Sequence, residues 1–247
     1  QGAEQGLSVY LDGVRFNQPF GDVVLLDLLP DHVLVSAQVN EANPVLGRNA
    51  LAGSLLVQTG DGVSLSGLRG SFDLDTAGGK GGAISLGLAD DAGDLLLAGD
   101  WRHDDGWRVA SPSRLYRGFA KGRHKGDGWG VEFSVLGAST DLTGNGVAPV
   151  ELLAADWSAV FTRPDTTRTN FVRLVAAPYV ETGETGRLEL RAYLQDISRR
   201  SANGDLADFG ACDDDAAFLC VGDEDEGFAD PLLSNGARVA REPDEDE

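Results

Sequence analysis

Seven segments after residue 62 alternate apolar and polar side chains with a period of two residues. They lie at residues 64–74, 83–89, 94–103, 114–123, 130–140, 169–180 and 187–197. This alternation predicts β-strands with one apolar and one polar face. No comparable run shows helical periodicity, and the chain contains 33 glycines. The sequence therefore predicts an all-β, turn-rich fold.

The connections between these segments alternate between short and long. Tight turns are predicted at residues 90–93, 125–128 and 181–186, whereas residues 104–113, residues 142–168 and everything after residue 198 form longer connections. Transmembrane β-barrels join strands of about ten residues by short periplasmic turns and longer extracellular loops. A soluble β-sandwich has the same period of two but no reason to alternate its loop lengths. The pattern favours antiparallel strands of a transmembrane barrel.

Side-chain alternation fits a wall between lipid and a polar interior. In residues 187–195, one face carries Leu188, Leu190, Ala192 and Leu194, and the other carries Glu189, Arg191, Tyr193 and Gln195. Likewise, Val131, Phe133 and Val135 alternate with Glu132 and Ser134, and Asp100 and Arg102 are expected on the inner face beside Trp101. Trp101, Trp129 and Tyr179 fall near strand ends, where aromatic girdles meet lipid headgroups.

The first sixty residues have a different pattern. Residues 7–11 and 53–59 read as short half-buried strands, and Asp12-Gly13 and residues 60–62 are turn sequences. Taken alone, these features are compatible with any small β domain with tight turns.

Two blocks in this region, residues 7–22 and 43–62, resemble the second half of the plug domain of TonB-dependent outer-membrane receptors. The matching positions are Asp12, Gly13 and Val14 in the first block, and Gly47, Asn49, Ala50, Gly53, Leu55, Val57 and Thr59 in the second. Ala52 replaces the first glycine of the usual pair. Residues 100–115, 139–154 and 162–169 resemble early barrel strands and loops of some of these receptors. The resemblance implies the C-terminal half of a plug in residues 1–62 and the first barrel strands and loops in residues 63–247.

The resemblance also implies a function, location and partners. Receptors of this family lie in the outer membrane of Gram-negative bacteria, with their long loops outside the cell. They take up scarce nutrients, commonly ferric siderophores or other metal complexes, with energy delivered by TonB. In that topology Asn17, Gln18 and Phe20 belong to an apical plug loop and are candidate ligand contacts; the alternative is that they fix the turn and pack against the barrel wall. The expected partners are TonB, a small-molecule or metal-chelate ligand and outer-membrane lipid.

The net charge of −20 is concentrated at the C-terminal end. Residues 205–247 contain 15 acidic residues and two arginines, a net of −13, which leaves −7 for residues 1–204. Such acidity argues against nucleic-acid binding. It predicts a solvated loop, with capture of cations as the alternative. Within this segment Cys212 and Cys220 have the short spacing of a disulfide in an exported protein.

Other chemistry has little support in the sequence. His32, His103 and His124 are scattered, no second cysteine pair accompanies the first, and no metal site or cofactor is predicted. The glycines of residues 76–83 lack the spacing of a phosphate-binding loop, and residues 141–152 depart from a calcium loop. No nucleophile motif suggests an enzyme.

Size distinguishes this chain from a complete transporter. Barrels of this type have about 22 strands, and an open set of seven would leave unpaired backbone groups in lipid. The chain starts at Gln1 without an initiating methionine or a signal-like segment. We therefore expect an internal part of a longer receptor. The alternatives are a soluble or surface-attached acidic β protein with an adhesive or metal-binding role, and a passive outer-membrane channel.

Overall fold

The computed structural model describes residues 6–19, 21–41, 53–76, 78–183 and 186–204, and the backbone of residues 209–211, 219–221, 231–234 and 237–240. The chain divides into two compact units, residues 1–203 and 204–247. No helix in the described part is long and apolar enough to span a bilayer.

The N-terminal segment, residues 6–62, contains a small mixed sheet. Its strands are β1 (Leu7–Leu11), β2 (Val14–Arg15), β3 (Leu34–Asn40) and β4 (Gly53–Thr59), in the spatial order β2-β1-β4-β3. β1 runs parallel to β4, with Val9 opposite Leu55. Two short 3₁₀ helices, η1 (Leu26–Leu28) and η2 (Asp31–Val33), precede β3.

The predicted strands at residues 7–11 and 53–59 are confirmed, whereas β3 was not predicted. Between β1 and β2, Asp12 and Gly13 both have positive φ, 49° and 77°. This conformation suits an Asp-Gly pair in a two-residue hairpin turn. Gly47, Asn49 and Ala50 of the second plug-like block lie outside the described residues.

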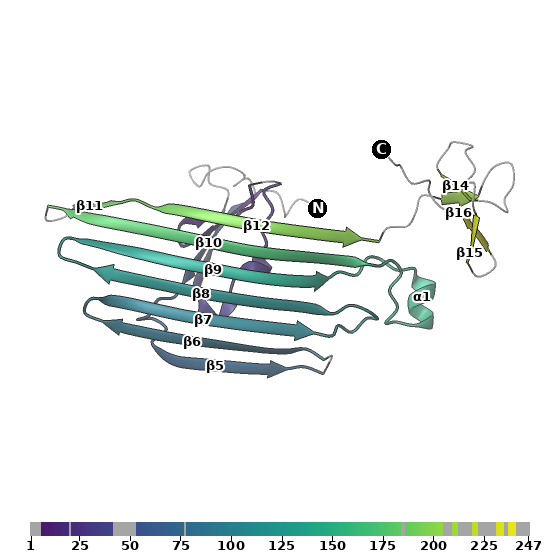
Figure 1. The fold of residues 1–247 in the computed structure, drawn as a ribbon, viewed down its shortest axis with the longest axis horizontal. Coiled ribbons are helices and arrows are strands. Elements are labelled where there is room, and N and C mark those ends of the chain that lie inside the picture. The colour runs from purple at the N-terminus through teal and green to yellow at the C-terminus, as the bar shows by residue number, and fades with distance from the viewer. Residues whose placement is uncertain are drawn as a thin grey trace. The chain divides into compact units, whose positions relative to one another are not determined.

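The remainder of the first unit is one large antiparallel sheet (Figure 1). Its strands are β5 (Gly67–Leu74), β6 (Lys80–Asp90), β7 (Gly93–Asp104), β8 (Ser113–Lys125), β9 (Trp129–Thr143), β10 (Asp165–Thr182), β11 (Gly186–Glu189) and β12 (Ala192–Asn203). From β5 to β10 each strand pairs with the next in sequence, and β11 and β12 both pair with β10. Strands form in all seven predicted segments, and the short and long connections alternate as predicted. Residues 64–66 lie outside β5, and β12 continues to Asn203, beyond the predicted end at residue 197.

The last predicted strand is interrupted where it faces a proline. Tyr179 pairs with Glu189 and Ala176 with Ala192, so the register is the same on both sides of the interruption. Between these pairs the Leu190 amide donates to the Pro178 carbonyl at 3.0 Å. Pro178 has no N–H to return this bond, which weakens the ladder there without shifting it.

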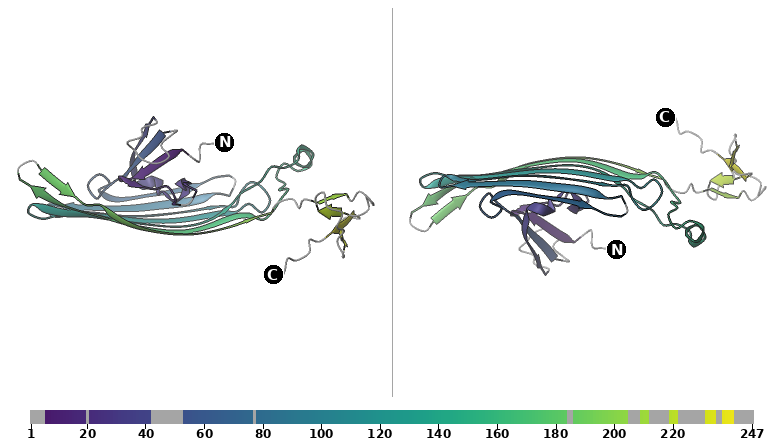
Figure 2. Two further views of the ribbon diagram at one scale, coloured as in Figure 1. Left: turned by 90° about the horizontal axis from the view of Figure 1, so that it is seen from above. Right: turned by 90° about the horizontal axis from the view of Figure 1, so that it is seen from below.

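The two faces of the large sheet differ in what they contact. The N-terminal segment stands on one face, here called the inner face, and the opposite side is the outer face (Figure 2). Leu96, Phe119, Leu136 and Phe171 of the inner face are buried in one apolar cluster with Val9, Phe16, Leu28 and Val33 of the N-terminal segment. On the outer face Phe133, Val172, Leu188 and Leu194 are exposed. The predicted alternation is confirmed. Asp100, Glu132 and Arg191 point inward, and the apolar residues that alternate with them along the chain point outward.

The long connections carry structure that the sequence did not predict. The loop between β9 and β10 contains a short helix, α1 (Val150–Ala155). Trp157 of this loop stacks on Trp107 of the loop between β7 and β8, with ring centroids 5.0 Å apart, and Val109 donates to the Ser158 carbonyl at 2.9 Å.

In the second unit, the segment predicted to be a solvated loop contains two hairpins. They are formed by β13 (Phe209–Ala211) with β14 (Leu219–Val221) and by β15 (Pro231–Ser234) with β16 (Ala237–Ala240). Cys220 lies in β14, but Cys212 lies outside the described residues, so the predicted disulfide stays a prediction.

Candidate functional site

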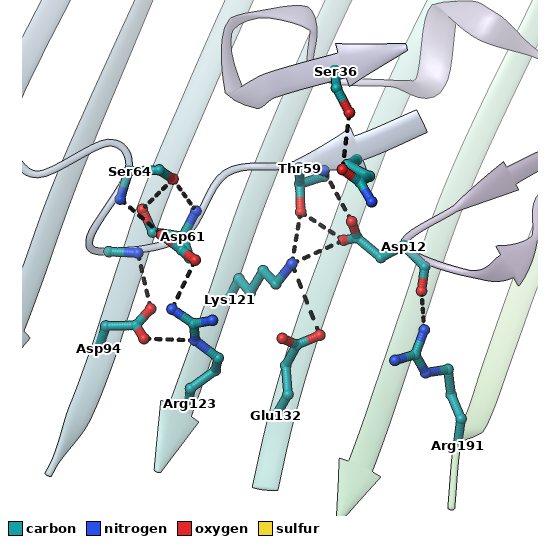
Figure 3. A network of polar contacts seen from close by, with 12 residues as sticks. Asp12, Ser36, Thr59, Asp61, Ser64, Asp94, Lys121, Arg123, Glu132 and Arg191 are labelled. Carbon is teal, nitrogen blue, oxygen red and sulfur yellow. Dashed lines mark hydrogen bonds and ion pairs between the residues drawn. The ribbon is translucent and has the colours of Figure 1, made fainter. Parts of the chain in front are cut away.

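The candidate site is the polar contact between the N-terminal segment and the inner face of the sheet (Figure 3). Strand β8 supplies it with Arg117, Lys121 and Arg123, here called the β8 cations. Their odd numbering places them on one face of the strand with Phe119. Each pairs with a different aspartate of the N-terminal segment: Arg117 with Asp31, Lys121 with Asp12, and Arg123 with Asp61. One strand therefore contacts three separate turns of the N-terminal segment.

Lys121 is the most enclosed of the β8 cations, with only 6% of its surface exposed. Its Nζ lies 3.3 Å from Asp12 Oδ2, 3.2 Å from Thr59 Oγ1 and 3.8 Å from Glu132 Oε1. Thr59 completes the cluster, because its hydroxyl and its amide donate to the two oxygens of the Asp12 carboxylate at 2.6 and 2.9 Å. This cluster joins the β1–β2 turn and the end of β4 to the wall through one buried ammonium group.

Arg123 forms a second cluster nearer the short turns. Its guanidinium contacts Asp61 and Asp94, both at 2.7 Å. Asp94 also accepts the Gly62 amide at 2.9 Å. Asp61 caps its own turn by accepting the amides of Val63 and Ser64. Burial raises the pKa of the Asp61 carboxyl, but the hydrogen bonds from Ser64 and the charge of Arg123 outweigh it and leave the pKa below its ordinary value.

Arg117 forms the third cluster, toward the long loops. Its guanidinium holds Asp100 of β7 at 2.8 Å and also contacts Asp31 and the Leu29 carbonyl. His32 Nδ1 lies 3.3 Å from the Asp100 carboxylate. Ligand atoms of Asp31, His32 and Asp100 lie within 4.8 Å of one another, the spacing of a metal site. Because Arg117 already pairs with both carboxylates, the cluster is better suited to holding the N-terminal segment than to binding a cation.

Arg173 of β10 is a buried cation of a different kind, 2% exposed. It donates to the Arg15 carbonyl at 3.1 Å and lies over the rings of Phe16 and Tyr193, 5.4 and 5.5 Å from their centroids. Its Nε and Nη1 have no hydrogen-bond partner in the described part of the chain. Contacts of this type compensate only part of the cost of burying a charge. Arg173 is thus held by aromatic faces and one backbone carbonyl.

A cavity of about 670 Å³ opens between the N-terminal segment and β12. It is lined by Arg15, Asn17, Gln18, Pro19, Asp22, Tyr193, Gln195 and Ile197. An ion pair of 2.7 Å between Arg15 and Asp22 lies in its wall. Arg191, just before β12, contacts the β1–β2 turn, and Gln195 of β12 contacts Gln18. The candidate loop therefore lies farther toward the long-loop end of the sheet than that turn.

The structure gives the predicted ligand contacts distinct surroundings. Asn17 is buried; its amide oxygen accepts the Val9 amide at 2.8 Å, and its nitrogen donates to the carbonyls of Leu7 and Asp22. These bonds fix the turn. Gln18 is also buried, but its side-chain nitrogen has no hydrogen-bond partner within the described residues. Phe20 lies outside the described residues.

The β8 cations and Arg173 were not singled out from the sequence, although a signal for them was present. In the segment RLYRGFAKGRHK, Arg117, Lys121 and Arg123 recur at even spacings and share a face with Phe119. Inward cations on a predicted barrel strand indicate a polar interior. Sequence periodicity does not show which aspartates these cations pair with, because the pairs are tertiary contacts.

Comparison with solved structures finds a similar fold in three receptors. The ferric-catecholate import receptor Fiu of E. coli K12 in its open form superposes with a TM-score of 0.67 at 14% identity, over 88% of this chain and 36% of that chain. The unliganded ferric citrate transporter FecA gives a TM-score of 0.67 at 11% identity, over 83% and 33%. The Serratia marcescens hemophore receptor HasR, a double mutant in complex with its hemophore HasA and heme, gives 0.54 at 16% identity, over 80% and 31%.

These likenesses concern the fold. No protein-family model and no curated protein sequence matches the chain. The chain spans about a third of the length of the three solved chains. Within that span the predicted all-β fold and the predicted resemblance to TonB-dependent receptors are confirmed.

Proposed function

We propose that this chain is part of a TonB-dependent outer-membrane receptor that takes up a scarce nutrient, a ferric siderophore or another metal complex. The observation that carries the proposal is the N-terminal segment held by the β8 cations on the inner face of a sheet whose outer face is apolar. A plug must sit inside its barrel and face a polar wall, while the other side of that wall meets lipid. The polar contacts of the inner face and the exposed apolar side chains of the outer face support both conditions.

The proposed division follows the fold. Residues 1–62 form the C-terminal half of the plug, and residues 63–247 form the first strands and loops of the barrel. Strands β5 and β12 each have one edge without a partner among the described residues. In lipid such edges must be paired, so we assign the neighbouring positions to further strands of the same barrel.

The proposed location is the outer membrane, with the long loops outside the cell. On the outer face of β9, the stretch from Trp129 to Ser139 covers eleven residues, whose ten steps span about 25 Å at a tilt of about 40°. This matches the apolar band of an outer-membrane barrel. The proposed partners are TonB, the transported ligand and outer-membrane lipid.

The proposed ligand site is the cavity lined by Asn17 and Gln18, and Phe20 belongs to the same loop. Asn17 shapes the loop through its three hydrogen bonds, which leaves Gln18 and the Arg15–Asp22 pair to meet a ligand. The similar structures are named for ferric-catecholate, ferric citrate and heme systems. Iron complexes with carboxylate or catecholate donors are frequently anionic, and the Arg15 guanidinium suits such a ligand. We propose no catalytic activity.

Energised uptake is the experiment that tests this function. The natural gene product containing this chain is expressed in an iron-starved Gram-negative host that lacks its own ferric receptors. Radioactive iron uptake is then measured with a panel of ferric chelates, with and without TonB. We expect at least one chelate to enter only when TonB is present.

The other outcomes separate the rival functions. Uptake that persists without TonB would identify a passive channel. Recovery of the protein outside the membrane fraction would favour the acidic β protein. A Gln18→Ala variant should lower ligand affinity, while Gln38→Ala, an exposed glutamine of β3, serves as the matched control.

A further inference from the structure

The outer face of the sheet carries a row of basic side chains at its long-loop end. In cross-strand register from β6 to β12, the row consists of Lys80, His103, Arg114, Asp141, Arg168 and Arg200. Four of the chain's 20 lysines and arginines are thus aligned across one edge of a molecule with a net charge of −20. This basic row is unlike the rest of the outer face, where Leu86, Leu97, Val135, Leu174 and Leu194 form an apolar row.

Within the described residues, three of the four lysines and arginines of the basic row have no ion pair, whereas His103 of the row hydrogen-bonds with Asp105 at 2.8 Å. Arg168 pairs with Asp141 at 3.2 Å, but it also lies directly opposite Arg200, a like-charge pair that destabilises a sheet. Lys80, Arg114 and Arg200 have no ion pair within the described residues. The row therefore attracts an anion.

An apolar groove of about 680 Å³ lies directly below this row, toward the short turns. The aromatic side chains of Phe72, Trp101 and Tyr116 form the rim of the groove nearest the basic row. Its floor follows the next row of the outer face, in which Gly99, Gly118 and Gly137 are paired in register. The groove is shallow and open to the outside, as a site for a flexible hydrocarbon chain should be.

The glycines of the floor are not required by the backbone. None of Gly99, Gly118 and Gly137 has positive φ. A Cβ added at Gly118 would meet nothing within 4 Å, and one at Gly99 would meet its nearest atom at 3.6 Å. Glycine in a strand costs roughly 0.5–1 kcal/mol relative to alanine, and in strands it marks places where a ligand or a backbone approaches closely.

We propose that this surface binds a lipid with an anionic phosphate headgroup, with the phosphate at Lys80 and Arg114 and an acyl chain in the glycine-floored groove. Arg114 and Gly118 are four residues apart on β8, about 13 Å along the strand, which separates a headgroup from the hydrocarbon beneath it. Trp101 and Tyr116 lie between the two levels, where aromatic rings favour the headgroup boundary. The inference rests on the proposed placement of the sheet in the outer membrane.

Charge and position favour a lipid over a second copy of the chain. Two copies would bring their basic rows together, and like charges facing one another oppose association. The groove also ends at β10, where Val172 replaces glycine. On β12 the same two rows carry Ser198 and Asp196, which break the apolar pattern. The site is therefore confined to β5–β9, beneath Lys80 and Arg114.

Selective lipid retention tests the charge part of this proposal. The natural gene product in detergent is titrated with phosphatidylglycerol or with phosphatidylcholine of the same acyl chains, and bound lipid is counted by native mass spectrometry. One cation near an anionic lipid surface corresponds to about a fivefold change in binding. We expect Lys80→Gln combined with Arg114→Gln to lower the preference for phosphatidylglycerol about 30-fold.

The matched control removes the same charge from the other face. Arg69→Gln combined with Arg199→Gln neutralises two exposed cations on the inner face of β5 and β12. This pair should leave the preference within twofold. An equal loss in both double variants would mean that the lipid senses only net charge, and would overturn the proposal, as would a wild-type protein without preference.

Filling the groove tests the acyl-chain part. Gly118→Leu should weaken retention of both lipids several-fold, because the added side chain occupies the groove. Ala120→Leu, two residues away on the same face, should not. Equal binding by the two variants would overturn the acyl-chain assignment.

Membrane fractionation of each variant keeps this inference separate from the proposed function. A protein found outside the membrane would overturn both. A protein inserted in the outer membrane, active in uptake and indifferent to lipid charge would overturn only the lipid site.

Discussion

The N-terminal segment and the large sheet are stabilised in contrasting ways. Neighbouring strands of the sheet are joined by long uninterrupted ladders, such as the pairing of β9 with β10 from Thr143 opposite Thr166 to Trp129 opposite Val180. Among the described residues no β-ladder joins the N-terminal segment to the sheet. The contact consists of an apolar cluster and of separate hydrogen bonds and ion pairs made by sheet side chains, chiefly the β8 cations, Arg173 and Arg191. Separate side-chain contacts can break without loss of the sheet, as the proposed displacement of a plug within a stable wall requires.

The largest expected effect comes from the apolar part of this contact. Phe16 is fully buried and packs edge-to-face on Phe171, with centroids 5.8 Å apart. Phe16→Ala should destabilise the attachment of the N-terminal segment by about 4 kcal/mol, because burial and packing are both lost. Hydrogen exchange in β1 and β4, measured by mass spectrometry, should accelerate while exchange in β8 and β9 does not. Phe72→Ala on the exposed outer face is the control.

Removing the buried ammonium should have the next largest effect. Lys121→Met leaves the Asp12 carboxylate without its buried partner, at an expected cost of about 3 kcal/mol. The same exchange measurement should again distinguish β1 and β4 from the sheet. Lys125→Met, at the exposed end of the same strand, should change little. Equal acceleration in the segment and the sheet would show that the two regions unfold as one.

The Asp61–Arg123 pair should contribute less, because both side chains are partly exposed. Arg123→Gln should weaken the contact by about 1 kcal/mol or less. The pKa of Asp61 is lowered in the folded protein, so its contribution is present above the ordinary aspartate pKa of 3.8 and is lost as pH falls through the folded value. Exchange followed between pH 5 and pH 2.5 should show this loss in the wild type and not in Asp61→Asn. An unchanged profile in that variant would contradict the assignment.

The smallest effect is expected on the outer face. Gly118 has an ordinary backbone conformation, and an added Cβ meets nothing. Gly118→Ala should leave stability unchanged or raise it by roughly 0.5 kcal/mol, since alanine loses less backbone freedom on folding. Thermal unfolding in detergent measures the change. A destabilisation above about 1 kcal/mol would show that this position is packed against something after all.

The sequence predicted the sheet better than the site. Period-two alternation and turn residues gave the strands, their faces and the alternating connections, because these depend on local chemistry and on burial on one side. Strand β3 was missed because five of its seven residues are exposed, so burial imposes no clear alternation of apolar and polar residues on its sequence. The helix α1 was missed because it is a short element in a long loop.

The site depended on contacts between residues far apart in sequence. The turn-forming role of Asn17 was anticipated as the alternative to ligand binding, and its hydrogen bonds support that alternative. Lys121 meets Asp12 across 109 positions, and Arg173 meets Arg15 across 158. Only the register of the sheet and the seating of the N-terminal segment bring these groups together.

Spin-label accessibility along β9 tests the central claim most directly. Single cysteines with nitroxide labels are placed at residues 131–136 of the natural gene product in lipid bilayers, and collisions with oxygen and with a water-soluble nickel chelate are measured. We predict that Val131, Phe133 and Val135 are accessible to oxygen but not to the chelate, and that Glu132, Ser134 and Leu136 are shielded from oxygen. Access of the chelate to the odd positions would contradict a wall between lipid and plug.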